Sequence, residues 1–150
     1  MIRHQIFQVI ICIFVFTTSA KFVFAQANKS EAIEKAKEAV RLMDEEQKYD
    51  DAIKLLNEAT ALDPGTIDYP YEIAYAYIAK KDYKKAVELL ELLTYHEHVH
   101  PRIFQALGNS YDYLGKPDVA IATYEKGTKK FPNAGELYLE LGNMNMQTKK

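Results

Sequence analysis

Apolar residues recur at intervals of three and four through most of the chain after residue 28, which predicts amphipathic helices rather than strands. The first two stretches show this spacing at Ile33, Ala36, Val40, Met43 and then at Ile53, Leu56, Ala59. The pattern is broken by short segments rich in Pro, Gly and charged residues, at 63–65, 80–82, 100–101, 115–117 and 131–133. The chain is therefore predicted to be a series of helices joined by short turns.

The helical segments repeat with a period of 34 residues. The clearest unit contains Phe104, Leu107, Gly108, Tyr111, Ala120, Tyr124 and Pro132. The matching places one period earlier are Pro70, Ile73, Ala74, Tyr77, Ala86, Leu90 and His98, and two periods earlier Ala36, Ala39, Val40, Met43, Ala52, Leu56 and Pro64. One period later come Tyr138, Leu141, Gly142 and Asn145. Self-similarity at such a period indicates a stack of repeated supersecondary units.

Each unit reads as a pair of helices that cross closely. Small residues occupy the crossing places, namely Ala74, Gly108, Gly142 on first helices and Ala52, Ala86, Ala120 on second helices. Asp50, Asp82 and the Lys116–Pro117 step are expected to begin second helices, and Asn28 with Glu31 to form a capping box at the start of the first helix. One pair cannot bury its own apolar face, so stacking of pairs is expected to form the core.

These positions resemble the tetratricopeptide repeat (TPR), whose pattern is W-x2-L-G-x2-Y, A-x3-F and P. The resemblance covers residues 33–150 of a domain spanning 26–150, in repeats at about 33–66, 67–100 and 101–134 and a partial repeat at 135–150. It implies an all-α, right-handed α-solenoid of antiparallel helix pairs, with about three repeats plus one capping helix. The sequence departs from the pattern at His98, where Pro is expected, and at Val40, where a small residue is expected.

The first 25 residues form a separate segment that reads as a secretory signal peptide. A basic start at Arg3 is followed by an apolar stretch and by small residues before Gln26, where cleavage is expected. The alternative is a retained membrane anchor, because apolar residues run from Ile6 to Ala25. Lys21 and the short uninterrupted apolar stretch argue against a full span. The mature chain is therefore predicted to be exported, periplasmic or secreted, without a stable membrane span.

Composition excludes some classes of function for the mature chain. The single cysteine, Cys12, lies inside the predicted signal peptide, so no disulfide or thiolate chemistry is expected after cleavage. Loss of Arg3 and Lys21 leaves 17 basic and 21 acidic side chains, a net charge of about −4. An acidic chain without a long basic patch is a poor binder of nucleic acid, because neutralising phosphate supplies much of that affinity.

The stretch His96-Glu97-His98-Val99-His100 matches H-E-x-x-H, the zinc-binding motif of many metallopeptidases. That motif needs a helix that places its two histidines one turn apart. The repeat instead assigns residues 96–100 to a turn, and Pro101 disfavours helical geometry at His100. We therefore predict no catalytic residue, no metal ligand and no cofactor, with a zinc-dependent hydrolase as the alternative.

The TPR resemblance implies a concave groove, lined by first helices, that binds an extended peptide or a partner helix. The residues predicted to contact a protein or peptide partner are Tyr71, Tyr75, Arg102, Asn109, Arg41 and Gln105. Alternatively, Tyr71 and Tyr75 fill gaps between repeats. Some relatives clamp an acidic chaperone tail; Lys37 and Arg102 match two places of that clamp, but Arg41, Glu72 and Ala106 do not match others. An adaptor or assembly factor is the function this implies.

The segment 134–148 is expected to be the first helix of a fourth repeat without its second helix. Leu137, Leu141 and Met144 can pack on the preceding repeat, whereas Tyr138, Leu139 and Met146 cannot all be covered by it. This helix is therefore predicted to cap the array and to offer a contact to a second copy or a partner. Capping alone is the simpler alternative. A further alternative is that the sequence is the N-terminal part of a larger TPR envelope protein.

Overall fold

The computed structural model describes the backbone of residues 2–148 and the side chains of residues 24–147. Seven helices occupy this part of the chain: α1 Ile2–Glu46, α2 Tyr49–Leu62, α3 Asp68–Ala79, α4 Tyr83–Leu93, α5 Pro101–Tyr113, α6 Pro117–Lys130 and α7 Gly135–Thr148. No strand occurs within residues 2–148. The all-α fold predicted from the spacing of apolar residues is confirmed.

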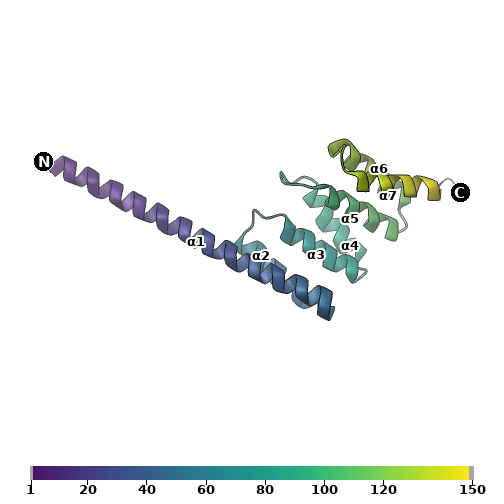
Figure 1. The fold of residues 1–150 in the computed structure, drawn as a ribbon, viewed down its shortest axis with the longest axis horizontal. Helices are drawn as coiled ribbons and strands as arrows, with labels where there is room; N and C mark the ends of the chain where they lie inside the picture. The colour runs from purple at the N-terminus through teal and green to yellow at the C-terminus, as the bar shows by residue number, and fades with distance from the viewer. Residues whose placement is uncertain (1, 149–150) are drawn as a thin grey trace.

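The helices form two layers. Each helix packs against the helices before and after it in the sequence, and α1, α3, α5 and α7 also approach one another in that order (Figure 1). The result is a solenoid of three helix pairs, α1/α2, α3/α4 and α5/α6, with α7 packed on the last pair. We call the exposed surface of α1, α3, α5 and α7 the first-helix face.

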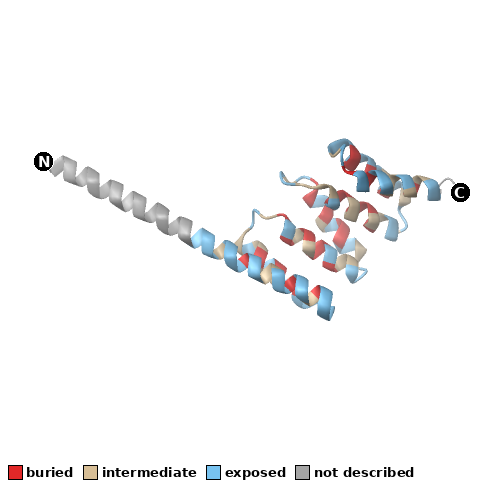
Figure 2. Ribbon diagram, viewed as in Figure 1, coloured by how far each residue is buried: buried red, intermediate tan, exposed pale blue. Residues whose placement is uncertain are grey.

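The core lies where successive helices face one another (Figure 2). Ala52, Ala74, Ala86 and Ala120 are fully buried, which confirms that small residues occupy the close crossings. At Gly108 an added Cβ atom would lie 2.3 Å from Cε1 of Tyr124, so only glycine fits there. Larger side chains such as those of Phe104, Tyr124 and Leu56 fill the space between these crossings.

The prediction for Gly142 is wrong. An added Cβ atom at Gly142 meets nothing within 4 Å, although this residue occupies the same place in the 34-residue pattern as Gly108. The reason is that Gly108 faces Tyr124 on the second helix of its pair, whereas no described helix crosses α7 at Gly142.

In the turn within each helix pair, the residue at the same repeat position has a left-handed backbone conformation. Gln47, Lys81 and Gly115 have φ angles of 54°, 62° and 71°, and they are spaced by one repeat period. The residue that follows each of them precedes the second helix, and its backbone N–H bonds back to a carbonyl of the first helix. Because left-handed geometry strains residues with a Cβ atom, Gly115, which has none, is the one of the three that adopts it without strain.

Lys81→Gly is expected to raise the free energy of unfolding by about 0.5–1 kcal/mol, because glycine relieves the strain of the left-handed turn. Gly115→Ala is the matched opposite change. It is expected to lower stability by a similar amount, since its Cβ atom would meet no neighbour and only the backbone geometry would be strained. Urea unfolding of both variants measures the two shifts, and equal signs would contradict this explanation.

Two predicted helix starts are wrong. The helix α1 continues through Asn28, so Asn28 and Glu31 do not cap its start; no Gly or Pro interrupts the chain before Pro64. The helix α2 begins at Tyr49, which places Asp50 within its first turn rather than at the cap. Asp82 does cap α4, accepting a hydrogen bond from the Lys85 N–H at 3.4 Å, and Pro117 does open α6.

The signal peptide predicted for residues 1–25 lies almost wholly outside the residues whose side chains are described. It therefore stays a prediction. Among the described residues, none of the helices combines the length and the apolar character that crossing a membrane requires.

Candidate functional site

The centre of the first-helix face is built around Tyr71 on α3. Its side chain is 8% exposed and packs into the core between repeats, as the gap-filling alternative holds. The Arg102 guanidinium of α5 lies over its ring at 5.1 Å, and the His100 ring meets it edge-on at 5.2 Å. Tyr71 therefore supports the side chains of His100, in the turn before α5, and Arg102, on α5, rather than being an open contact residue.

The Arg102 side chain is exposed, but its guanidinium group is held in place by the Tyr71 ring. Stacking of a cation on an aromatic ring contributes about 0.5–1 kcal/mol at exposed sites. The pKa of Arg102 is raised mainly by the Tyr71 hydroxyl and to a smaller extent by the carboxylates of Glu72 and Asp68. The guanidinium group therefore stays fully charged. Tyr75, one turn after Tyr71 on the same helix, is 49% exposed. The structure thus offers an oriented cation and an open aromatic ring on adjacent helices.

Glu72 is a half-buried carboxyl group beside this pair. Burial raises its pKa; Arg102 opposes that rise, while Asp68 and Asp44 add to it. Within residues 24–147 its side chain has no hydrogen bond and no ion pair. A half-buried carboxylate without a hydrogen bond or an ion pair is unfavourable for stability and is suited to a ligand that brings a hydrogen-bond donor or a positive charge.

Glu72→Gln is expected to raise the free energy of unfolding at about pH 7 and to leave it nearly unchanged at about pH 3. Because the pKa of Glu72 is raised on folding, its ionised form opposes folding at every pH above the folded-state pKa. Below the unfolded value of about 4.3, both states are protonated and this penalty disappears. Thermal unfolding at both pH values measures the difference, and a gain only in acid would contradict the assignment.

The other predicted groove residues are engaged within the chain. Arg41 bonds to Glu38 at 2.7 and 2.9 Å, to Glu46 at 2.7 Å and to Glu45 at 3.3 Å, all on its own helix. Gln105 Nε2 donates to Glu140 Oε1 of α7 at 3.0 Å. Asn109 Oδ1 accepts a 2.5 Å bond from the Tyr124 hydroxyl.

Of the predicted groove set, Tyr71 and Arg102 are therefore brought into contact, and Tyr75 is open one turn away. Arg41, Gln105 and Asn109 have internal partners that a ligand would have to compete with. Sequence reasoning assigned no groove role to Glu72 or His100. The position of Glu72 between Tyr71 and Tyr75 could have indicated a role in the groove. Its partial burial could not be predicted, because it depends on the neighbouring helix.

The histidine-rich stretch is a turn, as predicted. The helix α4 ends at Leu93, and His100 has an extended backbone with φ −129° and ψ 162°. His96 and His100 therefore do not lie one turn apart on a helix, which removes the geometry that the zinc motif requires. Among residues 24–147, no group of three His, Cys, Asp or Glu side chains is placed to hold a metal ion.

His100 is less exposed than a surface turn suggests. Its Nε2 atom lies 3.8 Å from Asp68 Oδ1, while its Nδ1 atom is buried with no hydrogen-bond partner among the described residues. Burial lowers the pKa of His100, and Asp68 opposes that shift. The His100 side chain therefore packs the turn against Tyr71.

Two family models match this chain, and both describe the tetratricopeptide repeat. One matches residues 45–109 and the other matches residues 101–144, which together span about two thirds of the sequence. The chain belongs to the tetratricopeptide-repeat family. Neither TPR match is to a catalytic family. No curated protein is significantly similar in sequence.

Solved TPR structures share this fold. The first TPR domain of Spaghetti (RPAP3) bound to the HSP90 peptide SRMEEVD is 21% identical, with a TM-score of 0.70, and the match covers 81% of this chain and 98% of that chain. The Sgt2 TPR domain from Aspergillus fumigatus is 24% identical, with a TM-score of 0.70 over 79% of this chain and 80% of that chain. MamA is 24% identical, with a TM-score of 0.67 over 86% and 74%.

Proposed function

We propose that this TPR chain is an exported protein-interaction module that binds a peptide or partner helix across α3 and α5 of its first-helix face. It would act as an adaptor or assembly factor without catalysis. The observation that carries the proposal is the oriented Arg102 guanidinium above Tyr71, with the open ring of Tyr75 one turn after Tyr71 on α3. Arginine and tyrosine are enriched among residues that contribute most to binding, and here Arg102 is already positioned by Tyr71 before a ligand arrives.

The charges on this face favour a basic ligand over an acidic one. On α1, Lys37 is paired with Glu34 at 2.8 Å and Arg41 is surrounded by three glutamates, so these two cations are already neutralised. Arg102 remains, but Glu72 and Asp68 lie close to it. An acidic tail such as SRMEEVD, the peptide bound to the RPAP3 domain, would meet more negative than positive charge here.

Peptide selection tests the proposed groove. Short random peptides are selected on the purified chain, and their affinities are measured by fluorescence anisotropy against wild type, Tyr75→Ala with Arg102→Ala, and the control Lys129→Ala on α6. The groove variant is expected to bind at least about tenfold more weakly and the control to bind normally. The selected peptides are expected to be rich in Lys or Arg.

Two results would contradict the proposed groove. If SRMEEVD binds the wild-type chain and Arg102→Ala abolishes that binding, the face is a clamp for acidic tails and the charge argument is wrong. If the groove variant binds the selected peptides as well as wild type does, the ligand does not lie across α3 and α5.

Export and self-association complete the proposal. Removal of residues 1–25 is supported by the signal-like sequence, and the intact mass of material recovered outside the cytoplasm tests it.

A contact between two copies through α7 is supported by the exposure of Tyr138, Leu139 and Met146 on that helix. Light scattering over a concentration series tests this contact. Wild type is expected to associate, whereas Leu139→Glu with Met146→Glu is expected to stay monomeric; a monomeric wild type would exclude it.

A further inference from the structure

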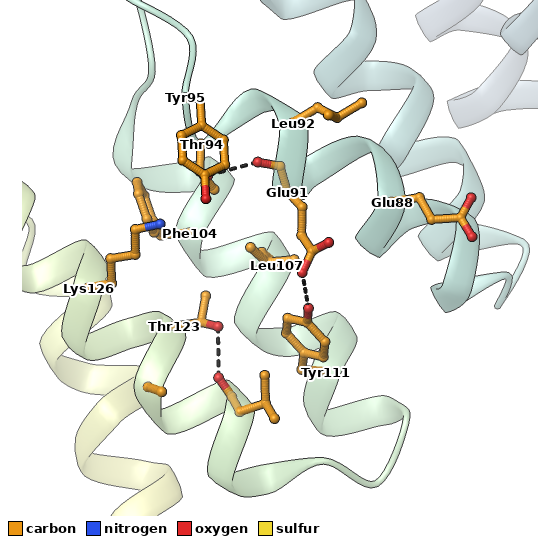
Figure 3. A pocket seen from close by; sticks show the side chains of 12 residues that line it. Glu88, Glu91, Leu92, Thr94, Tyr95, Phe104, Leu107, Tyr111, Thr123 and Lys126 are labelled. Carbon is orange, nitrogen blue, oxygen red and sulfur yellow. Dashed lines mark hydrogen bonds between the residues drawn. The ribbon is translucent and has the colours of Figure 1, made fainter.

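A groove lies between the second helices α4 and α6, away from the first-helix face. The Cα atoms of α4 stay more than 8 Å from those of α6, so α5 forms the floor between them. Phe104, Leu107 and Tyr111 lie along this floor at spacings of three and four residues, on one side of α5 (Figure 3). The cavity volume is about 440 Å³, enough for a few side chains of a bound segment.

The rim of this groove is apolar and exposed. Leu92 on α4 and Tyr95 in the turn after α4 are 72% and 81% exposed, and Val119 on α6 is 42% exposed. Large apolar side chains in such positions are costly to leave in water when they lie next to one another.

The other repeats show that the fold does not require apolar residues there. One repeat period away from Leu92 stand Glu58 and Lys126, and one period away from Tyr95 stand Ala61 and Lys129. The places that match Val119 hold Asp51 and Lys85. Since the second helices of the other repeats form with charged or small residues at the matching places, the solenoid does not require the apolar residues at this rim.

The charges around the groove are divided between its two walls. Glu88 and Glu91 lie on the α4 wall, where the Glu91 carboxylate accepts a hydrogen bond from the Tyr111 hydroxyl (Figure 3). Glu88 has no ion pair within the described residues. Lys126 lies on the α6 wall, and its ammonium group sits 4.9 Å from the centre of the Tyr95 ring. The α4 wall therefore carries uncompensated negative charge, whereas the cation opposite is already engaged.

We infer that this groove is a second docking site, which takes an amphipathic helix of a partner protein with apolar side chains on one face and a Lys or Arg beside them. The apolar side chains would lie between Leu92 and Tyr95 on one side and Val119 on the other, over the α5 floor. The basic side chain would lie against Glu88 and Glu91. Helices recognised in this way use residues three, four and seven apart, which matches the spacing along the α5 floor. A chain with binding sites on both faces could join two partners.

Two synthetic probes test this site on the purified full chain. The first is an alanine-based helical peptide with two leucines one turn apart and an arginine on the next turn of the same face. The second has glutamate in place of that arginine. We expect the arginine peptide to bind at least about tenfold more tightly than the glutamate peptide, and this preference to fall as salt is raised.

The variant Leu92→Lys with Val119→Lys replaces two of the three apolar rim residues by the lysine that another repeat carries at each place. It is expected to keep the melting temperature and to bind the arginine peptide at least about tenfold more weakly. Glu88→Gln with Glu91→Gln is expected to bring the two peptides to similar affinity. Lys54→Ala, an exposed residue on α2 that does not line the groove, is the control and is expected to change neither affinity. Tyr75→Ala is measured as well, to detect binding of the peptide on the first-helix face.

Three results would overturn the inference. Equal binding by wild type and Leu92→Lys with Val119→Lys would show that the groove is not the site. Loss of binding in Tyr75→Ala would place the peptide on the first-helix face, which would leave the proposed function intact. A wild-type chain that self-associates and becomes monomeric in the lysine variant would identify a second copy, rather than a basic helix, as the occupant.

Discussion

Gly108→Ala is expected to lower the free energy of unfolding by about 1–3 kcal/mol, although alanine is the better helix former. The added Cβ atom would lie 2.3, 2.5 and 2.9 Å from three ring atoms of Tyr124. That ring cannot easily move, because it is 1% exposed and its hydroxyl is bonded to Asn109. Gly108→Leu is expected to be more damaging still, since a longer side chain would push α5 and α6 apart.

Gly142→Ala is the matched control, one repeat period later on α7. Its Cβ atom would meet nothing within 4 Å, so only helix propensity changes. Stability is expected to rise by about 0.5–1 kcal/mol. Urea unfolding of the two alanine variants beside wild type measures both shifts. If Gly108→Ala were as stable as wild type, the close crossing of α5 and α6 at Tyr124 would be wrong.

Leu137→Ala is expected to lower the free energy of unfolding by about 2–5 kcal/mol, in the range for emptying a buried leucine site. Leu137 is completely buried and belongs to the cluster that contains Phe104, Ala134 and Met144. Its Cδ1 atom also approaches Gly127 of α6, within 2.9 Å of where a Cβ atom would stand. Loss of this side chain would loosen α7 from the last complete pair.

Leu139→Ala, two residues along the same helix, removes the same atoms from a side chain that is 64% exposed. Its effect is expected to stay within about 0.5 kcal/mol. Thermal and urea unfolding compare the two variants. Similar losses at both positions would show that α7 does not pack on α5 and α6 through the face that contains Leu137.

The helical architecture is largely legible from the amino-acid sequence. Apolar residues spaced by three and four predict helices, and the 34-residue period predicts that those helices pair and stack. Ala52, Ala86 and Ala120 are small because two helices approach there, and all three are fully buried. These features are local or strictly repeated, so the sequence alone was enough to determine them.

Other features depend on which neighbour is present. Gly108 and Gly142 occupy the same place in the repeat, yet only Gly108 faces an aromatic ring, because α7 has no described partner helix at that side. Tyr71 and Tyr75 lie one turn apart on α3, yet Tyr71 is buried against α5 and Tyr75 is half exposed. Spacing determines the face of a helix, whereas burial depends on how far the next helix extends over that face.

The sequence by itself thus determined the helices, their period and the small residues at most crossings, since each follows from side-chain size and spacing along one chain. Only the tertiary structure decided which groove residues are free. Gln105 is held by Glu140 of α7, while Arg102 is positioned by Tyr71 from the preceding repeat. The left-handed turns at Gln47 and Lys81 carry no glycine that would signal them. Closure between packed helices imposes that geometry, and the free energy of packing outweighs the local strain.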